Sequence, residues 1–325
     1  MSLIVNDNRK AWIDGLRALA IILVVFGHQM KGVTEYFIFT SPVKMPLFFA
    51  ISGYLFKMRD GDTNSFFIHL FKKLIIPWFC LALIPFLPKL FMGESFLEFI
   101  SNLVSGKSLW FMPCFVIAEI IHFYVRKITK KDIPIAMVCI LLTISGIVLH
   151  NKGLLDYAMF NRALSVQFFF LIGYWFKNNE QKMVNLPWGY IGLGGGLYLF
   201  LVILSLYIYP GVAIDVHLCS YYNYPYCFIL IIIGLIVLFT AAAKSNYSNR
   251  ILNVIGQNTL VLYIWHGSVI AILNYICTLS KISLGSIWIS ALLKSIWGVF
   301  VCTVLAQYIN KFAPEIVGKR RLNRK

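Results

Sequence analysis

The sequence predicts an all-α membrane protein that crosses a bilayer about ten times, with both termini on the cytoplasmic side. Of its 325 residues, 59% are hydrophobic and only 13% are charged, and the mean hydropathy is +0.77. Apolar runs of about 20 residues recur along the chain, and each is long enough to cross a hydrocarbon core about 30 Å thick. Lysines and arginines collect in alternate connecting segments, as they do in proteins that span a membrane repeatedly.

The apolar runs define ten expected spans. They lie at residues 11–30, 44–58, 73–92, 108–126, 132–150, 162–177, 187–209, 221–243, 251–276 and 286–310. The second is short, because a helix from Met45 to Phe56 rises only about 18 Å. This segment, with Ser52 and Gly53 at its middle, either spans the membrane or re-enters on the same side.

The positions of the 29 lysines and arginines favour ten true spans with an inner N-terminus. In that topology twenty of them lie in inner segments, seven in outer segments, and Arg17 and Lys294 within spans. Such an asymmetry is the usual mark of cytoplasmic loops. A re-entrant second segment with an inner N-terminus would reverse the asymmetry, whereas one with an outer N-terminus would preserve it. We therefore expect ten spans and keep the second arrangement as the alternative.

The chain is expected to form one membrane-embedded domain over residues 1–325, with its core at 11–310 and a basic cytoplasmic tail at 311–325. The tail should attract anionic lipids. Cytoplasmic loops that collect cations account for the net charge of +16, so nucleic acid is not an expected partner. The seven cysteines are scattered without metal-ligand spacing, and we expect them to be packing residues, with no metal site.

An arginine and a histidine lie inside the first apolar run. Arg17 and His28 are eleven residues apart, which on a helix places them within about 20° on one face and about 16 Å apart along the axis. Charged and titratable side chains are costly in a membrane unless they face a polar interior, which favours a functional site. The alternative is that Arg17 snorkels to headgroups and His28 is interfacial. Asp14 lies on the same face and can hold the guanidinium.

Two later spans also contain polar residues. His266 is expected at the same depth as His28, so the two histidines either flank one cavity or belong to the aromatic belt. Glu119 lies near mid-membrane and should be paired or line a cavity. His122, one helical turn away, is its favoured partner.

Basic and aromatic residues mark the membrane surfaces. Lys72 and Lys73 begin the third span, where they are either a topology anchor or a binding site for the phosphates of an anionic cofactor. Trp110, Tyr174 and Trp265 can stack on sugar faces, although most aromatic residues of such a chain belong to the interfacial belt and the core. Among these three, we expect only Trp110 to bind a substrate.

A set of motifs occurs in a fixed order from residue 12 to about 310. Arg17 and His28 enclose ten residues, and the later motifs are Met45–Phe56, Lys72–Lys73 before Pro77, Leu109–Phe111, Phe170–Tyr174 and Ile255–His266. Together they make the chain resemble the acyltransferase 3 family, integral-membrane acyltransferases that modify bacterial surface polysaccharides, lipopolysaccharide and related glycans. The chain departs from the family at Lys72 and Lys73, where the family usually has arginines.

The resemblance implies a reaction and a location. The protein would move an acetyl group from cytoplasmic acetyl-CoA to a hydroxyl of a lipid-linked or surface polysaccharide, without a metal ion. It would lie in the bacterial cytoplasmic membrane as a multi-pass protein, in contact with anionic lipids.

The resemblance also implies roles for individual residues. His28 would be the general base or a transient carrier of the acyl group. His266 would orient the acceptor or stabilise the developing oxyanion, and Trp110 would bind the acceptor. The other expected site residues are Arg17, Lys72 and Lys73 on the cofactor, and Asp14, Ser52 and Glu119 in support.

Two other classes of protein are compatible with this pattern. A transporter or flippase of a lipid-linked saccharide would also place polar residues on membrane helices, although the sequence has no internal repeat. A non-catalytic subunit of an envelope complex would tolerate replacement of His28. Only a transferase changes the mass of its glycan by an acyl group.

Overall fold

The computed structural model describes residues 10–58, 63–282 and 285–319, and within these ranges the protein is almost wholly helical. Its only extended pairing there is an isolated antiparallel bridge between Asp215 and Ser220. The predicted all-α fold is therefore confirmed. Arg9, Arg59 and the last residues of the basic tail, 320–325, lie outside the described residues.

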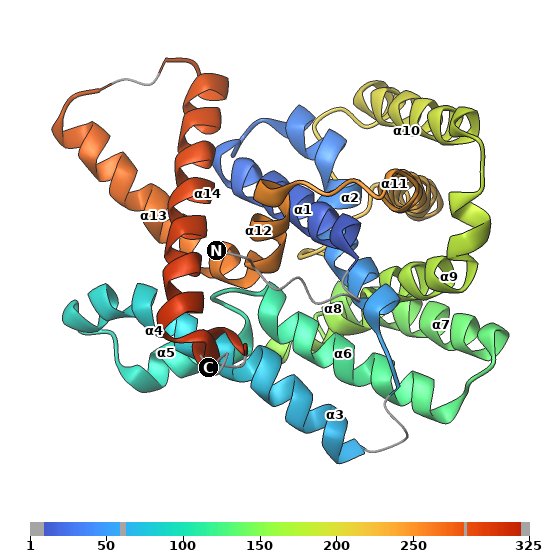
Figure 1. The fold of residues 1–325 in the computed structure, drawn as a ribbon, viewed down its shortest axis with the longest axis horizontal. Coiled ribbons are helices and arrows are strands. Elements are labelled where there is room, and N and C mark those ends of the chain that lie inside the picture. The colour runs from blue at the N-terminus through green and yellow to red at the C-terminus, as the bar shows by residue number, and fades with distance from the viewer. Residues whose placement is uncertain (1–9, 59–62, 283–284, 320–325) are drawn as a thin grey trace, which may run out of the picture.

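The helices follow one another as Figure 1 shows. The longer ones are α1 (Ala11–Gln29), α2 (Thr34–Leu55), α4 (Ile76–Phe91), α6 (Phe111–Ile128), α7 (Asp132–Asn151), α9 (Gln167–Val184), α10 (Trp188–Ile208), α11 (Tyr224–Ser245), α13 (Thr259–Leu279) and α14 (Ile287–Phe312). The shorter ones are α3 (Thr63–Leu70), α5 (Phe96–Ser105), α8 (Phe160–Ser165), α12 (Arg250–Gln257), the π-helical turn η1 (Phe71–Ile75), and the 3₁₀ turns η2 (Tyr157–Met159) and η3 (Pro314–Val317).

Eight helices in the described part of the chain are long and apolar enough to cross a membrane. They are α1, α2, the continuous rod from α3 through η1 to α4, α7, α10, α11, α13 and α14. Helices α6 and α9 have 18 residues each but carry three charged side chains apiece. The structure thus confirms a polytopic membrane architecture, while ten crossings and cytoplasmic termini stay predictions.

The second span is longer than the sequence pattern indicates. Helix α2 begins at Thr34, well before the predicted start at residue 44, and ends at Leu55. Its 22 residues rise about 33 Å, which is enough to cross a bilayer. The pattern missed this start because Pro42 and Pro46 lie inside the helix, where neighbouring membrane helices make proline tolerable. The short length that suggested a re-entrant segment is therefore not found, because α2 is long enough to span the membrane.

Two glycines let helices approach at backbone distance. A Cβ on Gly53 of α2 would lie 2.1 Å from the carbonyl oxygen of Phe170 on α9. A Cβ on Gly256 of α12 would lie 1.9 Å from the carbonyl oxygen of Asp14 on α1. No larger residue fits without moving a backbone, so these contacts fix α9 against α2 and α12 against the start of α1.

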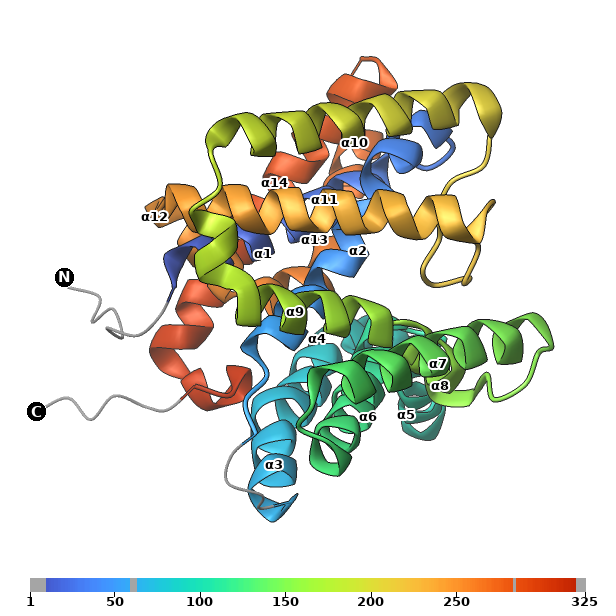
Figure 2. The same ribbon diagram turned by 90° about the vertical axis from the view of Figure 1, so that its right-hand side faces the viewer.

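Helices α1 and α2 lie at the centre of the molecule, with α13 and α14 on one side and α10 and α11 on the other (Figure 1). Figure 2 shows α9 running between α11 and the pair formed by α6 and α7. Large aromatic side chains from α2, α9 and α11 are fully buried and form the core: Phe49, Phe169, Phe170, Phe176 and Phe239.

The first and last described residues lie at the same end of the bundle. The Lys10 ammonium pairs with Glu180, near the end of α9, at 2.6 Å. The Lys319 ammonium donates to the Asn258 side chain at 3.1 Å, where α12 meets α13 beside the start of α1. We call this the inner end, and the end at which α1 stops the outer end, following the predicted topology.

Candidate active site

The structure brings together the two histidines that the sequence placed at similar depth. His28 lies in the last turn of α1 and His266 in α13, and their ring centroids are 5.0 Å apart at an angle of 37°. The His28 side chain is exposed, whereas His266 is buried. The pair therefore has one accessible imidazole and one that is fixed in the protein.

A backbone carbonyl sets the orientation of His266. Its Nδ1 lies 2.8 Å from the carbonyl oxygen of Leu262, one turn earlier on α13. A carbonyl only accepts a hydrogen bond, so Nδ1 carries a proton. In the neutral ring the lone pair is then on Nε2, which can accept a proton or a hydrogen bond.

Arg17 does not belong to the histidine pair. It faces the same side of α1 as His28 but lies about 16 Å nearer the inner end. Its guanidinium is 3.8 Å from the carboxylate of Asp14, and the two side chains are 30% and 3% exposed, respectively. The Gln257 amide of α12 donates to the same carboxylate at 3.2 Å. The buried Asp14 carboxylate therefore holds the Arg17 guanidinium, which remains partly exposed to solvent.

Lys72 and Lys73 lie in the π-helical turn between α3 and α4, and both are exposed. Such turns interrupt regular helix and occur often at functional sites. The Lys73 ammonium donates to the carbonyl oxygen of Gly318, which follows η3. The segment after α14 thus folds back onto this turn.

A chain of polar contacts connects the two basic regions of the inner end. Asp14 accepts from Gln257, and the next residue, Asn258, accepts from the Lys319 ammonium at 3.1 Å. Lys319 adjoins Gly318, which contacts Lys73. Arg17 and the lysine pair therefore lie on parts of the fold that the C-terminal segment holds together.

The predicted pairing of Glu119 with His122 is wrong. Glu119 on α6 instead accepts a hydrogen bond from Ser52 on α2. The His122 ring is fully buried between Phe56 and Phe170, with ring centroids 4.9 and 5.0 Å away, and it makes no hydrogen bond with Glu119. Spacing along α6 placed the two residues on one face, but packing against α2 and α9 directs His122 between aromatic rings.

Trp110 lies at the outer end, just before α6. Its ring stacks on His217 with centroids 4.7 Å apart and an angle of 29°. The next residue, Phe111, donates its backbone N–H to the Tyr263 hydroxyl at 3.3 Å. Tyr263 is one turn before His266 on α13, so Trp110 is connected to the histidine pair through one helix.

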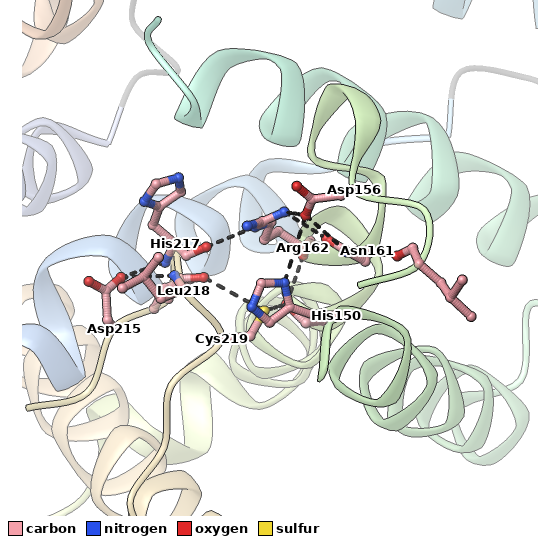
Figure 3. A network of polar contacts seen from close by, with 11 residues as sticks. His150, Asp156, Asn161, Arg162, Asp215, His217, Leu218 and Cys219 are labelled. Atoms are coloured by element: carbon pink, nitrogen blue, oxygen red, sulfur yellow. Dashed lines mark hydrogen bonds and ion pairs between the residues drawn. The ribbon is translucent and has the colours of Figure 1, made fainter. Parts of the chain in front are cut away.

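His217 belongs to a loop that sequence reasoning did not select. In Figure 3 its carbonyl oxygen faces Arg162 of α8, and its backbone N–H faces Asp215. Arg162 also pairs with Asp156. From the sequence, Arg162 counted only as an outer-segment charge, because its contact with the His217 carbonyl joins positions 55 residues apart.

Over the described residues, no group of three or more histidine, cysteine or acidic side chains is arranged to hold a metal ion. The chemistry available at the outer end is that of two imidazoles, a tyrosine hydroxyl and an aromatic stack. At the inner end it is that of Arg17 and the exposed lysines Lys72 and Lys73. The first set suits proton transfer at a hydroxyl group, and the second suits an anionic ligand.

Comparison with known proteins identifies the family. A family model described as an acyltransferase domain matches residues 10–309. The match extends from the start of α1 to near the end of α14 and so includes every residue of the candidate site. No curated protein and no solved structure gives a match. The chain therefore belongs to the acyltransferase 3 family of membrane proteins.

Proposed function

We propose that the protein is an O-acyltransferase that moves an acetyl group from acetyl-CoA at its inner end to a hydroxyl of a lipid-linked or surface polysaccharide at its outer end. The layout of α1 carries this proposal. Arg17 lies in its inner half, and His28 lies in its last turn beside His266. One helix thus holds a cation for an anionic donor and an imidazole for a hydroxyl about 16 Å apart. Family membership supports acyl transfer as the reaction class.

The inner end supplies the cations for the donor. Arg17 is held by the buried Asp14 on one side and is 30% exposed, so its planar fork can meet a phosphate. Lys72 and Lys73 add two exposed ammonium groups. Lys73 already donates to one carbonyl, which leaves two of its three protons for phosphate oxygens.

The outer end supplies the proton transfer. His28 accepts the proton of the acceptor hydroxyl as its oxygen attacks the thioester carbonyl carbon; the C–S bond breaks, and the CoA thiolate leaves and takes up a proton. In the other order, His28 attacks the thioester first and then passes the acetyl group to the hydroxyl. His266 accepts a hydrogen bond at Nε2 and orients the acceptor, or, once protonated, stabilises the oxyanion.

The remaining predicted residues bind the acceptor or hold the helices around the site. Trp110 contacts the acceptor sugar, and Ser52 and Glu119 join α2 to α6 beneath it. We place the protein in the bacterial cytoplasmic membrane, where the basic inner end faces anionic lipids.

The experiment uses membranes of the source organism, which contain the native acceptor, and labelled acetyl-CoA. Wild-type membranes should incorporate label into lipid-linked or polymeric glycan, and His28→Ala membranes should not. Equal incorporation by both would remove His28 from the chemistry. No incorporation by either would overturn the proposal and favour a transporter or flippase of the saccharide.

A further inference from the structure

The loop between α10 and α11, residues 209–223, has buried side chains and internal hydrogen bonds of its own; we call it the outer loop. Three of its apolar residues, Ile214, Val216 and Cys219, are each 3% exposed or less. Asp215 and Ser220 exchange two backbone hydrogen bonds of 3.0 and 2.9 Å. A connection that only joins two helices needs no such core, so its conformation has a use.

Arg162 fixes the outer loop to the rest of the protein. Its side chain is 6% exposed, and its Nε donates to the His217 carbonyl oxygen at 2.8 Å. Its other end pairs with Asp156, which precedes α8. This pair adds little stability, because the guanidinium has lost its water while the Asp156 side chain is 58% exposed and remains solvated. Its clearer effect is geometric, since the guanidinium fork holds one carbonyl in one place.

The loop presents His217 at a fixed position. Its backbone N–H, with that of Leu218, donates to the Asp215 carboxylate at 2.8 and 3.1 Å, which closes a tight turn. The imidazole then stacks on Trp110, and both rings are half-buried. The pair thus offers an aromatic surface with a hydrogen-bonding edge, a combination that binding sites use to fix a ligand's orientation.

We propose that Trp110 and His217 form the platform on which the acceptor sugar binds, and that Arg162 is the residue that positions it. The inference rests on the proposed function and names the acceptor's binding site. The C–H face of the sugar lies against the aromatic rings, and its hydroxyls exchange hydrogen bonds with the imidazole. Phe111 and Tyr263 connect this platform to α13 one turn from His266, which places the sugar beside the histidine pair.

The experiment measures KM separately for the two substrates. The acceptor is the organism's surface polysaccharide, cut into soluble oligosaccharides and de-acylated by mild alkali; the donor is labelled acetyl-CoA. His217→Ala and Arg162→Lys should each raise the acceptor KM roughly tenfold, the loss expected for one or two hydrogen bonds, and leave the donor KM unchanged. His217→Gln keeps a donor and an acceptor group and should recover part of the loss.

A matched control comes from the same loop. Tyr209 stacks on Tyr222 with centroids 4.2 Å apart, so Tyr209→Ala removes a stacked ring of the outer loop that is not part of the platform. It should leave the acceptor KM unchanged. An equal rise in this control, or an unchanged acceptor KM in His217→Ala, would overturn the platform.

A direct binding measurement separates this inference from the proposed function. Quenching of tryptophan fluorescence by the same oligosaccharides is followed in purified wild type, His217→Ala and Trp110→Phe, without acetyl-CoA. Binding that weakens in both variants supports the platform even if the wild type transfers no acetyl group. Transfer by the wild type with equal binding by all three proteins would refute the platform and leave the proposed function intact.

Discussion

The inner and outer ends of the molecule present different kinds of side chain. The inner end presents Arg17, Lys72 and Lys73, whose charges are partly or fully exposed. The buried Asp14 carboxylate contacts Arg17, and the carbonyl of Gly318 accepts from Lys73. The outer end presents imidazoles and aromatic rings, with its one buried arginine closed off by Asp156. Exposed cations favour an anionic ligand of variable pose, whereas oriented rings favour a neutral ligand held in one pose. Under the proposed function, the charge of the donor is recognised at the inner end of α1 and the shape of the acceptor at the outer end.

After the loss of His28, which abolishes transfer, the largest effect should come from His266, the histidine that is fixed in the protein. His266→Phe keeps a buried ring but removes Nε2, and we expect transfer to fall at least about a hundredfold, the usual size of a lost acid–base group. The donor KM should stay unchanged because the inner end is intact. The measurement is steady-state transfer with both substrates varied. Tyr275→Phe, on the exposed side of the same helix, is the control, and an equal loss there would remove the specific role of His266.

Arg17→Lys should have the next largest effect. The charge stays, but the planar fork that suits phosphate is lost, along with its fit beside Asp14. We expect the donor KM to rise roughly tenfold, the cost of about one charge-assisted hydrogen bond, with the acceptor KM unchanged. Kinetics in membranes at several acetyl-CoA concentrations test this. A rise in the acceptor KM instead would contradict the assignment of donor binding to the inner end and acceptor binding to the outer end.

The two lysines of the π-helical turn should matter less and depend on salt. Replacing Lys72 and Lys73 together by alanine should raise the donor KM by about two- to fivefold at low ionic strength, and the difference should shrink in high salt because exposed charges are screened. The double variant Lys130→Ala, Lys131→Ala, in the exposed connection between α6 and α7, is the matched control. The same salt-sensitive rise in both proteins would indicate general attraction instead of a site.

The smallest effect concerns pH at the outer loop. Burial lowers the pKa of His217 below its ordinary value; Asp215 opposes this shift, and the positive charge of Arg162 adds to it. The unfolded chain therefore takes up this proton more readily, and the loop loses stability as the pH falls through the ordinary histidine value of about 6.5. The Tm of the wild type should drop slightly more between pH 7.5 and 5.5 than that of His217→Gln. Equal drops would show that this imidazole does not contribute.

Helix periodicity was enough to predict the central part of the site. Arg17 and His28 share a face because both lie on one helix, and the depth of His266 followed from its distance along another. The all-α membrane fold followed from the apolar runs. The start of α2 was missed, because proline and polar residues inside a packed membrane helix look like a loop in the sequence.

Of the proposed platform, the sequence indicated only Trp110, and the parts of His217 and Arg162 were missed for a different reason. Arg162 contacts a carbonyl 55 residues away, and His217 contacts the ring of Trp110, just before α6. Neither contact leaves a periodic signal, since it depends on how a loop folds back onto two helices. His122 shows the opposite failure: the local spacing was right, but the rings of Phe56, just after α2, and Phe170 on α9 determined where the side chain lies.

Transfer between two separated compartments tests the central claim most directly. The purified protein is reconstituted in sealed vesicles, with labelled acetyl-CoA, which does not cross the bilayer, on one side and de-acylated soluble oligosaccharide on the other. The account predicts that label appears on the oligosaccharide when acetyl-CoA is at the inner end and the acceptor at the outer end, and that His28→Ala abolishes it. Transfer only when both substrates are on the same side would contradict an acyl path along α1.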